Sequence, residues 1–401
     1  MDFDFTDDQL SLRDAVARWV DKGFSFERRH AIAKSGGRTR DVYGELAELG
    51  LTGIAVPDSH GGMGFGPVEA MVVMEELGRG LVNAPFAAGA LVAPMLLAAA
   101  PAALQSAWLP RIASGKALVV LAHQERASRY RLSQVAASAK RVGNGWQLSG
   151  HKSVVPAADE ADAFIVPARV GAGPSQADGS PSGGRERSEP GGANVSGAQT
   201  DASGIGLFLV EKGAKGSQIQ AYPTQDGARA GELRLADTPA SAIEENGFAT
   251  LERAVDIGIA AACAEGVGVM DKLVALTVEY MNTRKQFGTT LATFQALRHR
   301  IADVKMQLEL GRSMSYFASL KLGEPAAARR RALSQAKVRL GQSMRFVGQQ
   351  CTQLHGGIGL TDEYIGSHYF KRLTMLELTF GDTMHHLGEV SARMTDSTGV
   401  F

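Results

Sequence analysis

The spacing of apolar residues changes twice along this chain of 401 residues, and this change limits the folds open to it. The first region has helical spacing, with apolar Val16 and Val20 following a candidate N-cap at Thr6. Short β-like runs come next, and helical spacing then returns and continues to the end. The order predicts a helical N-terminal domain at 1–115, a β domain at 116–245 and a helical C-terminal domain at 246–401.

The middle region carries several short runs with strand-like composition: 118–121, 146–148, 163–166, 207–210 and 233–235. The sequence Gly-Asn-Gly at 143–145 is typical of a tight β-hairpin turn. Residues 171–204 are almost wholly small and polar, so they cannot bury enough apolar surface to offset the cost of ordering them. We therefore expect a disordered insertion between two strands of the β domain.

Charge and cysteine content exclude several classes of protein. The 42 basic and 42 acidic residues cancel, which gives no electrostatic reason to expect nucleic acid or an anionic membrane as a partner. Cys263 and Cys351 lie in apolar helical contexts, so buried thiols are expected rather than a disulfide.

The acidic N-terminus has no basic-then-apolar leader, which favours a cytoplasmic protein. The uncharged run at 81–110 is interrupted by prolines and predicts short buried helices rather than a membrane span.

The segment 283–288 combines a cation, an aromatic ring and a glycine. Arg284 is a planar, permanently charged donor suited to a diphosphate, and Phe287 could stack on an adenine or pack in a core. Gly288 is expected to end the preceding helix. Taken alone, the pattern is also that of an exposed arginine beside a helix end.

A second glycine-rich segment, 353–360, follows a predicted helix and not a strand, so it is not a Rossmann loop. Gly356 and Gly357 could bring bare backbone N–H groups against a polar ligand, or could simply end the helix. Gly266 and Gly268 lie inside a helical apolar stripe, where close helix packing is the better explanation.

Together these segments resemble the signatures of the acyl-CoA dehydrogenase family, and the likeness extends over nearly the whole chain. Residues 284–295 resemble the Arg-x-x-Phe-Gly…Gln signature, and residues 353–360 resemble Gln-x-x-Gly-Gly-x-Gly. Residues 149–152 resemble a strand entry of the family's β domain, and residues 55–64 resemble its N-terminal turn. The resemblance implies an α+β fold: a helical N-terminal domain, a β-barrel or sandwich middle domain and a C-terminal four-helix bundle.

The resemblance also implies FAD, bound between the β domain and the C-terminal bundle in a tetramer built from dimers. The residues implied to contact the dinucleotide are Arg284, Gln286, Phe287, Leu291, Gln353, Gly356 and Gly357. The first four of these would contact a flavin held mainly by the neighbouring subunit. Thr383 would lie beside the flavin. An acyl-CoA substrate and an electron-transfer flavoprotein as redox partner are implied as well.

Within the family, residues 1–5, 360–364 and 368–374 resemble the small subunits of pimeloyl-CoA dehydrogenases. In such systems two different dehydrogenase-like chains are thought to pair. This narrower likeness implies a dicarboxylyl-CoA substrate and a homo- or hetero-tetramer with a second chain of the same kind. A steroid side chain or another bulky acyl group stays open.

The chain departs from the family at its catalytic base. In the family a carboxylate removes the substrate's α-proton while the β-hydrogen leaves as hydride to the flavin. Gly381 stands in place of the usual glutamate, and Gly258 stands at the alternative position on the preceding helix. Asp382 is the only local candidate base, although it could instead hydrogen-bond nearby backbone. His385 and His386 lack a partner at metal-ligand spacing, so no metal is expected; packing or solvent roles are favoured, though one could approach the cofactor.

The chain also departs at Pro156, where the family has Thr or Ser. Proline supplies neither N–H nor O–H to the flavin's reactive edge. Three functions therefore stay open. The first is FAD-dependent α,β-dehydrogenation of an acyl-CoA by the small member of a hetero-oligomer. The second is a non-catalytic partner that completes a companion's FAD site, and the third is a flavin oxidase or monooxygenase on the same fold.

Overall fold

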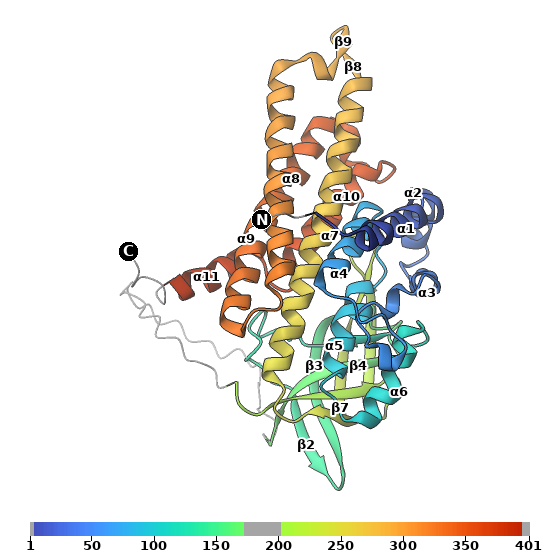
Figure 1. Ribbon diagram of the computed structural model, residues 1–401, viewed down its shortest axis with the longest axis vertical. Helices are drawn as coiled ribbons and strands as arrows, with labels where there is room; N and C mark the ends of the chain where they lie inside the picture. Colours follow the sequence, from blue (N-terminus) through green and yellow to red (C-terminus); the bar gives the residue numbers. More distant parts are fainter. Residues whose placement is uncertain (1–3, 172–201, 395–401) are drawn as a thin grey trace, which may run out of the picture.

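The computed structural model describes residues 4–171 and 202–394, so the predicted insertion at 171–204 lies almost entirely outside the described residues. A group of helices, a group of strands and a second group of helices follow one another along the chain, as predicted. In Figure 1 the strands lie at one end of the molecule, and the long C-terminal helices extend from them to the other end.

The N-terminal helices are α1 (Asp7–Gly23), α2 (Phe26–Lys34), α3 (Arg40–Glu48), α4 (Pro67–Arg79), α5 (Ala93–Leu97) and α6 (Ala102–Ala113). Thr6 caps α1: its hydroxyl accepts a hydrogen bond from the Gln9 backbone, and the Gln9 side chain accepts one from the Thr6 backbone. The predicted N-cap is therefore confirmed. The uncharged run folds into a π-helical turn (Ala87–Val92), α5 and α6, short helices as predicted. Among the described helices, none has both the length and the apolar character needed to span a bilayer.

The strands are β1 (Val119–Leu121), β2 (Ser138–Val142), β3 (Gly145–Pro156), β4 (Ala163–Val170), β5 (Ile205–Glu211), β6 (Ser217–Pro223) and β7 (Arg229–Glu244). The pairings β4–β2, β2–β3, β3–β7, β7–β5 and β5–β4 close a ring, while β1 pairs with β4 and β6 pairs with β7. Val142 pairs with Gly145, so the predicted hairpin turn at 143–145 is confirmed. Closing the ring leaves few free strand edges.

The C-terminal helices are α7 (Phe248–Thr283), α8 (Gln295–Lys321), α9 (Ala326–His355), α10 (Ile365–Leu378) and α11 (Thr383–Met394). The prediction that Gly288 ends a helix is wrong, because α7 already ends at Thr283. Gly288 instead forms the turn of a small hairpin between β8 (Lys285–Gln286) and β9 (Thr289–Thr290). Gly356 ends α9 with φ of 66°, as predicted, because this left-handed conformation suits a residue without Cβ.

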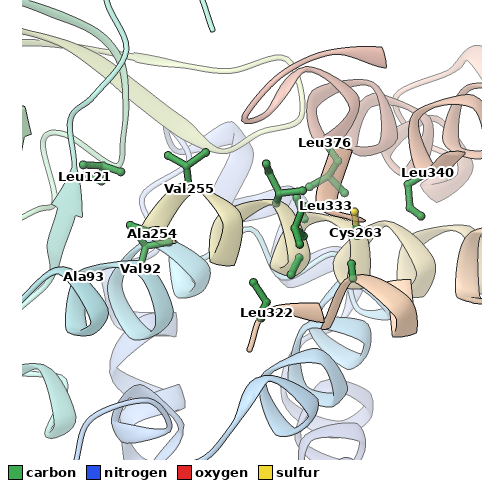
Figure 2. Close-up of a cluster of buried hydrophobic side chains, with 14 of the residues drawn as sticks. Val92, Ala93, Leu121, Ala254, Val255, Cys263, Leu322, Leu333, Leu340 and Leu376 are labelled. Carbon is green, nitrogen blue, oxygen red and sulfur yellow. The ribbon is translucent and has the colours of Figure 1, made fainter. Parts of the chain in front are cut away.

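The helix α7 forms the centre of the largest apolar core. Figure 2 shows its Val255 and Cys263 among side chains from neighbouring helices, including Leu333 of α9 and Leu376 of α10. Both Cys263 and Cys351 are buried free thiols, as predicted. The core therefore joins α7 to α5, α6, α8, α9 and α10 and to strands β1, β4 and β5.

The N-terminal and C-terminal helical groups meet where α4 crosses α7. A Cβ added to Gly268 would lie 1.8 Å from the backbone oxygen of Glu75, and one added to Gly78 would lie 2.2 Å from that of Glu265. The two backbones can approach this closely only because neither residue has a side chain. This confirms helix packing as the role of Gly268.

We predict that Gly268→Ala destabilises the protein, because the new methyl group overlaps the α4 backbone. The expected loss of unfolding free energy is about 1–3 kcal/mol. Gly44→Ala in α3 is the control, since no atom lies within 4 Å of its added Cβ. That variant should be neutral or stabilised by about 0.5–1 kcal/mol. Thermal and urea unfolding measure both, and equal stability of the two variants would contradict the predicted crossing.

Candidate active site

A cavity of about 470 Å³ lies where the three domains meet. Its apolar wall comes from α4 and the following turns, including Met74, Leu77 and Phe86. The β domain contributes residues such as His123, Val154 and Pro156. The helices α7 and α10 and the turn after α10 complete the lining with Gly258, Ala262, Glu265, Arg372, Leu376 and Phe380. A largely apolar cavity with a few polar groups is the usual form of a small-molecule site. We call it the central cavity.

One end of the central cavity is closed by an aromatic pair. The Phe380 ring stacks on His123, with ring centres 5.7 Å apart and planes at 14°. It also fills the space beside Gly258, where an added Cβ would lie 2.5 Å from it. Burial, and to a lesser extent the Lys152 charge, lower the pKa of His123 to about 4. His123 is therefore neutral at physiological pH, and position 258 has no room for a side chain while the ring stays there.

A buried ion pair holds the loop that carries His123. Lys152 of β3 donates from Nζ to Glu125 Oε1 over 2.5 Å. Glu125 also accepts hydrogen bonds from the backbone N–H groups of Ala136 and Ala137. Burial lowers the pKa of Lys152, and Glu125 counteracts that effect. The pair thereby fixes the 122–137 loop against β3 beside the cavity.

Pro156 and Val154 face the central cavity from the end of β3. Pro156 pairs with Ala230 of β7, and Val154 has φ of 53° at an irregularity of the ladder. Neither side chain carries a hydrogen-bond donor. The wall where the resemblance implies a hydroxyl is therefore apolar.

Asp382, the predicted base, directly precedes α11 and caps it. Its Oδ1 accepts a hydrogen bond from the backbone N–H of His385 at 2.8 Å, and its Oδ2 lies 3.2 Å from Arg129 Nη2. Thr383 donates from Oγ1 to Glu377 Oε1 at 2.6 Å. Neither Asp382 nor Thr383 is among the residues that line the central cavity.

His386 lies behind the aromatic pair. Its Nε2 contacts the Phe380 carbonyl oxygen at 3.1 Å, and its Nδ1 contacts Ser334 Oγ at 3.3 Å. A carbonyl accepts only, so Nε2 carries the proton and Nδ1 accepts from the serine. Burial, with smaller effects from nearby cations, lowers the pKa of His386 to about 3. His386 thus supports the chain at Phe380 as a neutral side chain.

The residues expected to meet a dinucleotide lie at the far end of the helical domain. Figure 1 shows α7 and α8 running together to the β8–β9 hairpin, which carries Gln286 and Phe287. Phe287 is 91% exposed. Leu291 follows the hairpin, and its N–H donates to the Arg284 carbonyl. The end of α9 joins this region, because the His355 ring packs on Tyr280 with centres 4.7 Å apart.

The chemistry of this end fits part of a dinucleotide. Within residues 4–171 and 202–394, the Arg284 side chain has no hydrogen bond or ion pair, so its guanidinium is free for a diphosphate. No atom lies within 4 Å of a Cβ added at Gly356 or Gly357, which leaves room for close approach to their backbone. Gln353 is exposed beside them.

The structure therefore separates the predicted site residues into two groups. Arg284, Gln286, Phe287, Leu291, Gln353, Gly356 and Gly357 share one end of the helical domain. Thr383 contacts α9 at Gly341, fifteen residues before Gly356, which is about 22 Å along a helix. Asp382 is next to Thr383, so the candidate base and the candidate dinucleotide residues lie far apart in one chain.

The cluster of His30, Asp362 and His368 has the composition of a metal site, with candidate ligand atoms within 4.8 Å of one another. Its hydrogen bonds oppose that role. Arg29 donates to Nδ1 of His368 at 2.8 Å, so the proton of His368 is on Nε2, where it is donated to the Asp362 carbonyl. Nε2 therefore has no free lone pair for a metal, and the Arg29 charge repels a cation.

The sequence did not indicate the polar group at the other end of the central cavity. Arg372 donates to Glu265 Oε1 at 2.5 Å and to Asp226 Oδ2 at 2.7 Å. The one available signal was the charge of Glu265 within the apolar stripe of α7. The bond to Arg372 accounts for a buried carboxylate at this position.

Comparison with known proteins agrees with this geometry. Residues 6–116 match the model of the acyl-CoA dehydrogenase N-terminal domain, and residues 245–395 match that of the acyl-CoA dehydrogenase C-terminal domain. The chain belongs to the acyl-CoA dehydrogenase family. Its helical N-terminal domain, strand-rich middle domain and helical C-terminal domain are the fold of that family.

Several known proteins are similar over their full length. Acyl-CoA dehydrogenase FadE27 of Mycobacterium tuberculosis is 24% identical, covering 99% of this chain and all of the relative. A variant of the Tcur3481–Tcur3483 steroid acyl-CoA dehydrogenase is 26% identical with a TM-score of 0.83, covering 98% of this chain and 99% of that one. The FAD complex of PigA has a TM-score of 0.84 at 21% identity, with 98% and 99% coverage.

We predict that His386 makes stability fall with acidity. Its folded-state pKa, about 3, is below the ordinary value of 6.5, so the unfolded state takes up a proton first as the pH falls. Stability present above pH 6.5 is then lost towards pH 3, with a slope of up to about 1.4 kcal/mol per pH unit. Urea unfolding at pH 7, 6 and 5 should show that the unfolding free energy of His386→Gln changes less steeply with pH than that of the wild type.

The control is His299→Gln, at an exposed position of α8. It should keep the wild-type slope. Parallel slopes for wild type and His386→Gln would show that His386 is not the buried neutral group.

Proposed function

We propose that this chain is one subunit of an FAD-dependent acyl-CoA dehydrogenase, paired with a companion chain of the same fold. The proposal is carried by the free Arg284 guanidinium at the exposed end of α7, a cation with no described partner in its own chain. Arg284, Gln286, Phe287 and Leu291 would hold the adenine and diphosphate end of a flavin shared with the companion. Gln353, Gly356 and Gly357 would contact the same dinucleotide.

The bound flavin would supply hydride acceptance from the β-carbon of the acyl thioester. At the central cavity, the chain's own residues would exclude water: Phe380 and His123 close one end of the cavity, and Pro156 and Val154 line its wall. Thr383 next to the flavin stays a prediction from the family resemblance. Electron-transfer flavoprotein is proposed as the acceptor of the electrons.

The second candidate function, a partner that does not abstract the proton itself, is favoured by the carboxylates around the central cavity. Asp226 and Glu265 are held by Arg372, and Glu160 accepts two backbone hydrogen bonds from Thr39 and Arg40. Asp382 caps α11 and pairs with Arg129. Each described carboxylate that lines the cavity accepts a hydrogen bond, although one oxygen of Glu160 and one of Glu265 accept none. Because Glu265 lies at the end of the cavity away from Gly258, we propose that the companion abstracts the proton. Catalysis by Asp382 stays the alternative.

The relatives support a paired assembly. The Tcur3481–Tcur3483 steroid enzyme, which is similar over nearly the whole chain, is named for two proteins. We therefore propose a hetero-tetramer over a homo-tetramer. The substrate class is an acyl-CoA; a dicarboxylyl-CoA rests on the narrower resemblance alone. An oxidase or monooxygenase would be recognised by rapid reoxidation of the reduced flavin by oxygen without a response to acyl-CoA.

The proposal predicts that the chain purified alone binds little FAD, and that the complex copurified with its companion is yellow. Arg284→Gln should lower FAD retention by that complex tenfold or more, because a charge-assisted contact to the diphosphate is lost. Lys285→Gln, a neighbouring exposed cation, is the matched control and should change retention less than twofold. Flavin absorbance after gel filtration measures both. Equal retention by the two variants would refute a role for Arg284.

We predict that Asp382→Asn in the complex leaves flavin bleaching by acyl-CoA within about twofold of wild type. The amide keeps the size of the side chain and can still accept the hydrogen bond from the His385 backbone. Stopped-flow absorbance under anaerobic conditions gives the bleaching rate. A loss of a hundredfold or more would instead identify Asp382 as the base.

A further inference from the structure

The central cavity has two chemically different ends. Gly258, Ala262 and Glu265 line it from one face of α7, separated by four and three residues. Gly258 meets the Phe380 ring, and Glu265 meets Arg372 of α10. Seven residues of helix separate the two ends by about 10 Å. An acyl group lying along α7 would therefore extend from the aromatic pair towards charged groups.

The far end is held by a buried ionic network. Arg372 binds Glu265 and Asp226, and the Asp226 carbonyl accepts further hydrogen bonds from Arg29 Nη2 and Asn83 Nδ2, each at 2.6 Å. Burial opposes the charge of Arg372, but the two carboxylates outweigh it and raise its pKa. Burial alone would raise the pKa of Asp226; Arg372 and local hydrogen bonds lower it overall. Both groups are therefore charged at physiological pH.

Three polar atoms at this end are not used by the network. Asn83 Oδ1 is buried without a hydrogen-bond partner. The orientation of the Asn83 amide is fixed, because Nδ2 must face the Asp226 carbonyl, which can only accept a hydrogen bond. Among the described residues, Arg372 Nη2 and Glu265 Oε2 also make no hydrogen bond, and all three residues line the cavity. A buried unpaired polar atom is costly, so a ligand that satisfies Asn83 Oδ1 and also pairs with Arg372 Nη2 or Glu265 Oε2 gains affinity.

We infer that this end of the cavity is a subsite for a neutral hydroxyl group on the distal part of the acyl chain. A hydroxyl can donate to Asn83 Oδ1 or Glu265 Oε2 and accept from Arg372 Nη2, so one group satisfies both kinds of atom. A distal carboxylate has no proton to donate and would meet the charges of Glu265 and Asp226. An ammonium group would be repelled by Arg372. The inference rests on the proposed function, since it assumes that an acyl-CoA enters this cavity.

The test measures binding of three acyl-CoAs of equal length to the full chain with its companion. Isothermal titration compares octanoyl-CoA, 8-hydroxyoctanoyl-CoA and suberyl-CoA, which end in a methyl group, a hydroxyl and a carboxylate. We expect the hydroxylated ligand to bind about tenfold more tightly than octanoyl-CoA or better, and suberyl-CoA to bind no better than octanoyl-CoA.

The variant Asn83→Leu should remove this preference, so that octanoyl-CoA binds at least as well as its hydroxylated analogue. Met375→Leu is the control, because it changes the cavity lining without changing a hydrogen-bonding N or O atom. It should leave the order of the three binding affinities unchanged. Tightest binding of suberyl-CoA, or an unchanged preference in Asn83→Leu, overturns the inference but not the proposed function. If none of the three ligands binds, the proposed function fails as well.

Discussion

The contact on which the arrangement of the domains depends most is the one between Arg372 and its two carboxylates. Arg372 belongs to α10, Glu265 to α7 and Asp226 to the chain before β7. The Asp226 carbonyl accepts hydrogen bonds from Arg29 of α2 and from Asn83 in the loop after α4. The Arg372 guanidinium therefore joins the C-terminal and β domains, and the Asp226 carbonyl extends the link to the N-terminal domain. Loss of one partner of a buried charge pair typically costs about 3–5 kcal/mol, so these groups hold the domains in a definite relation.

This network also determines the shape of the central cavity. It closes one end with charged and polar groups, while the stacked rings of Phe380 and His123 close the other. The α4–α7 crossing brings the apolar wall close to α7, because Gly268 and Gly78 leave no side chains between the backbones. The cavity thus has one aromatic end, one polar end and apolar sides, which suits an elongated ligand rather than a round one.

The chain keeps the family fold while its chemical groups are arranged differently. Gly381 and Gly258 stand where the family resemblance implies carboxylates, and Phe380 fills the space beside Gly258. At the other end of the helical domain, Arg284 is exposed and unpaired within the described chain. Under the proposed function, such a chain would contribute binding groups to a shared site, since fold alone does not determine which chain carries out the reaction.

The sequence by itself determined the family, the order of helical and strand-rich domains, the Thr6 cap, the 143–145 hairpin turn and the helix end at Gly356. These features depend on spacing and turn chemistry within a few residues, which sequence patterns report directly. It placed the end of α7 wrongly, because Gly288 is equally suited to a hairpin turn.

Only the tertiary structure decided the content of the candidate site. Asp226 and Arg372 are separated by 146 residues, and Glu265 and Arg372 by 107, so no local pattern indicates that they meet. The same holds for Phe380 beside Gly258 and His123, and for the distance between Asp382 and Arg284. Such contacts result from how the domains pack. A buried charged side chain is stable only when it is paired, and its partner comes from the segment that packing places opposite it.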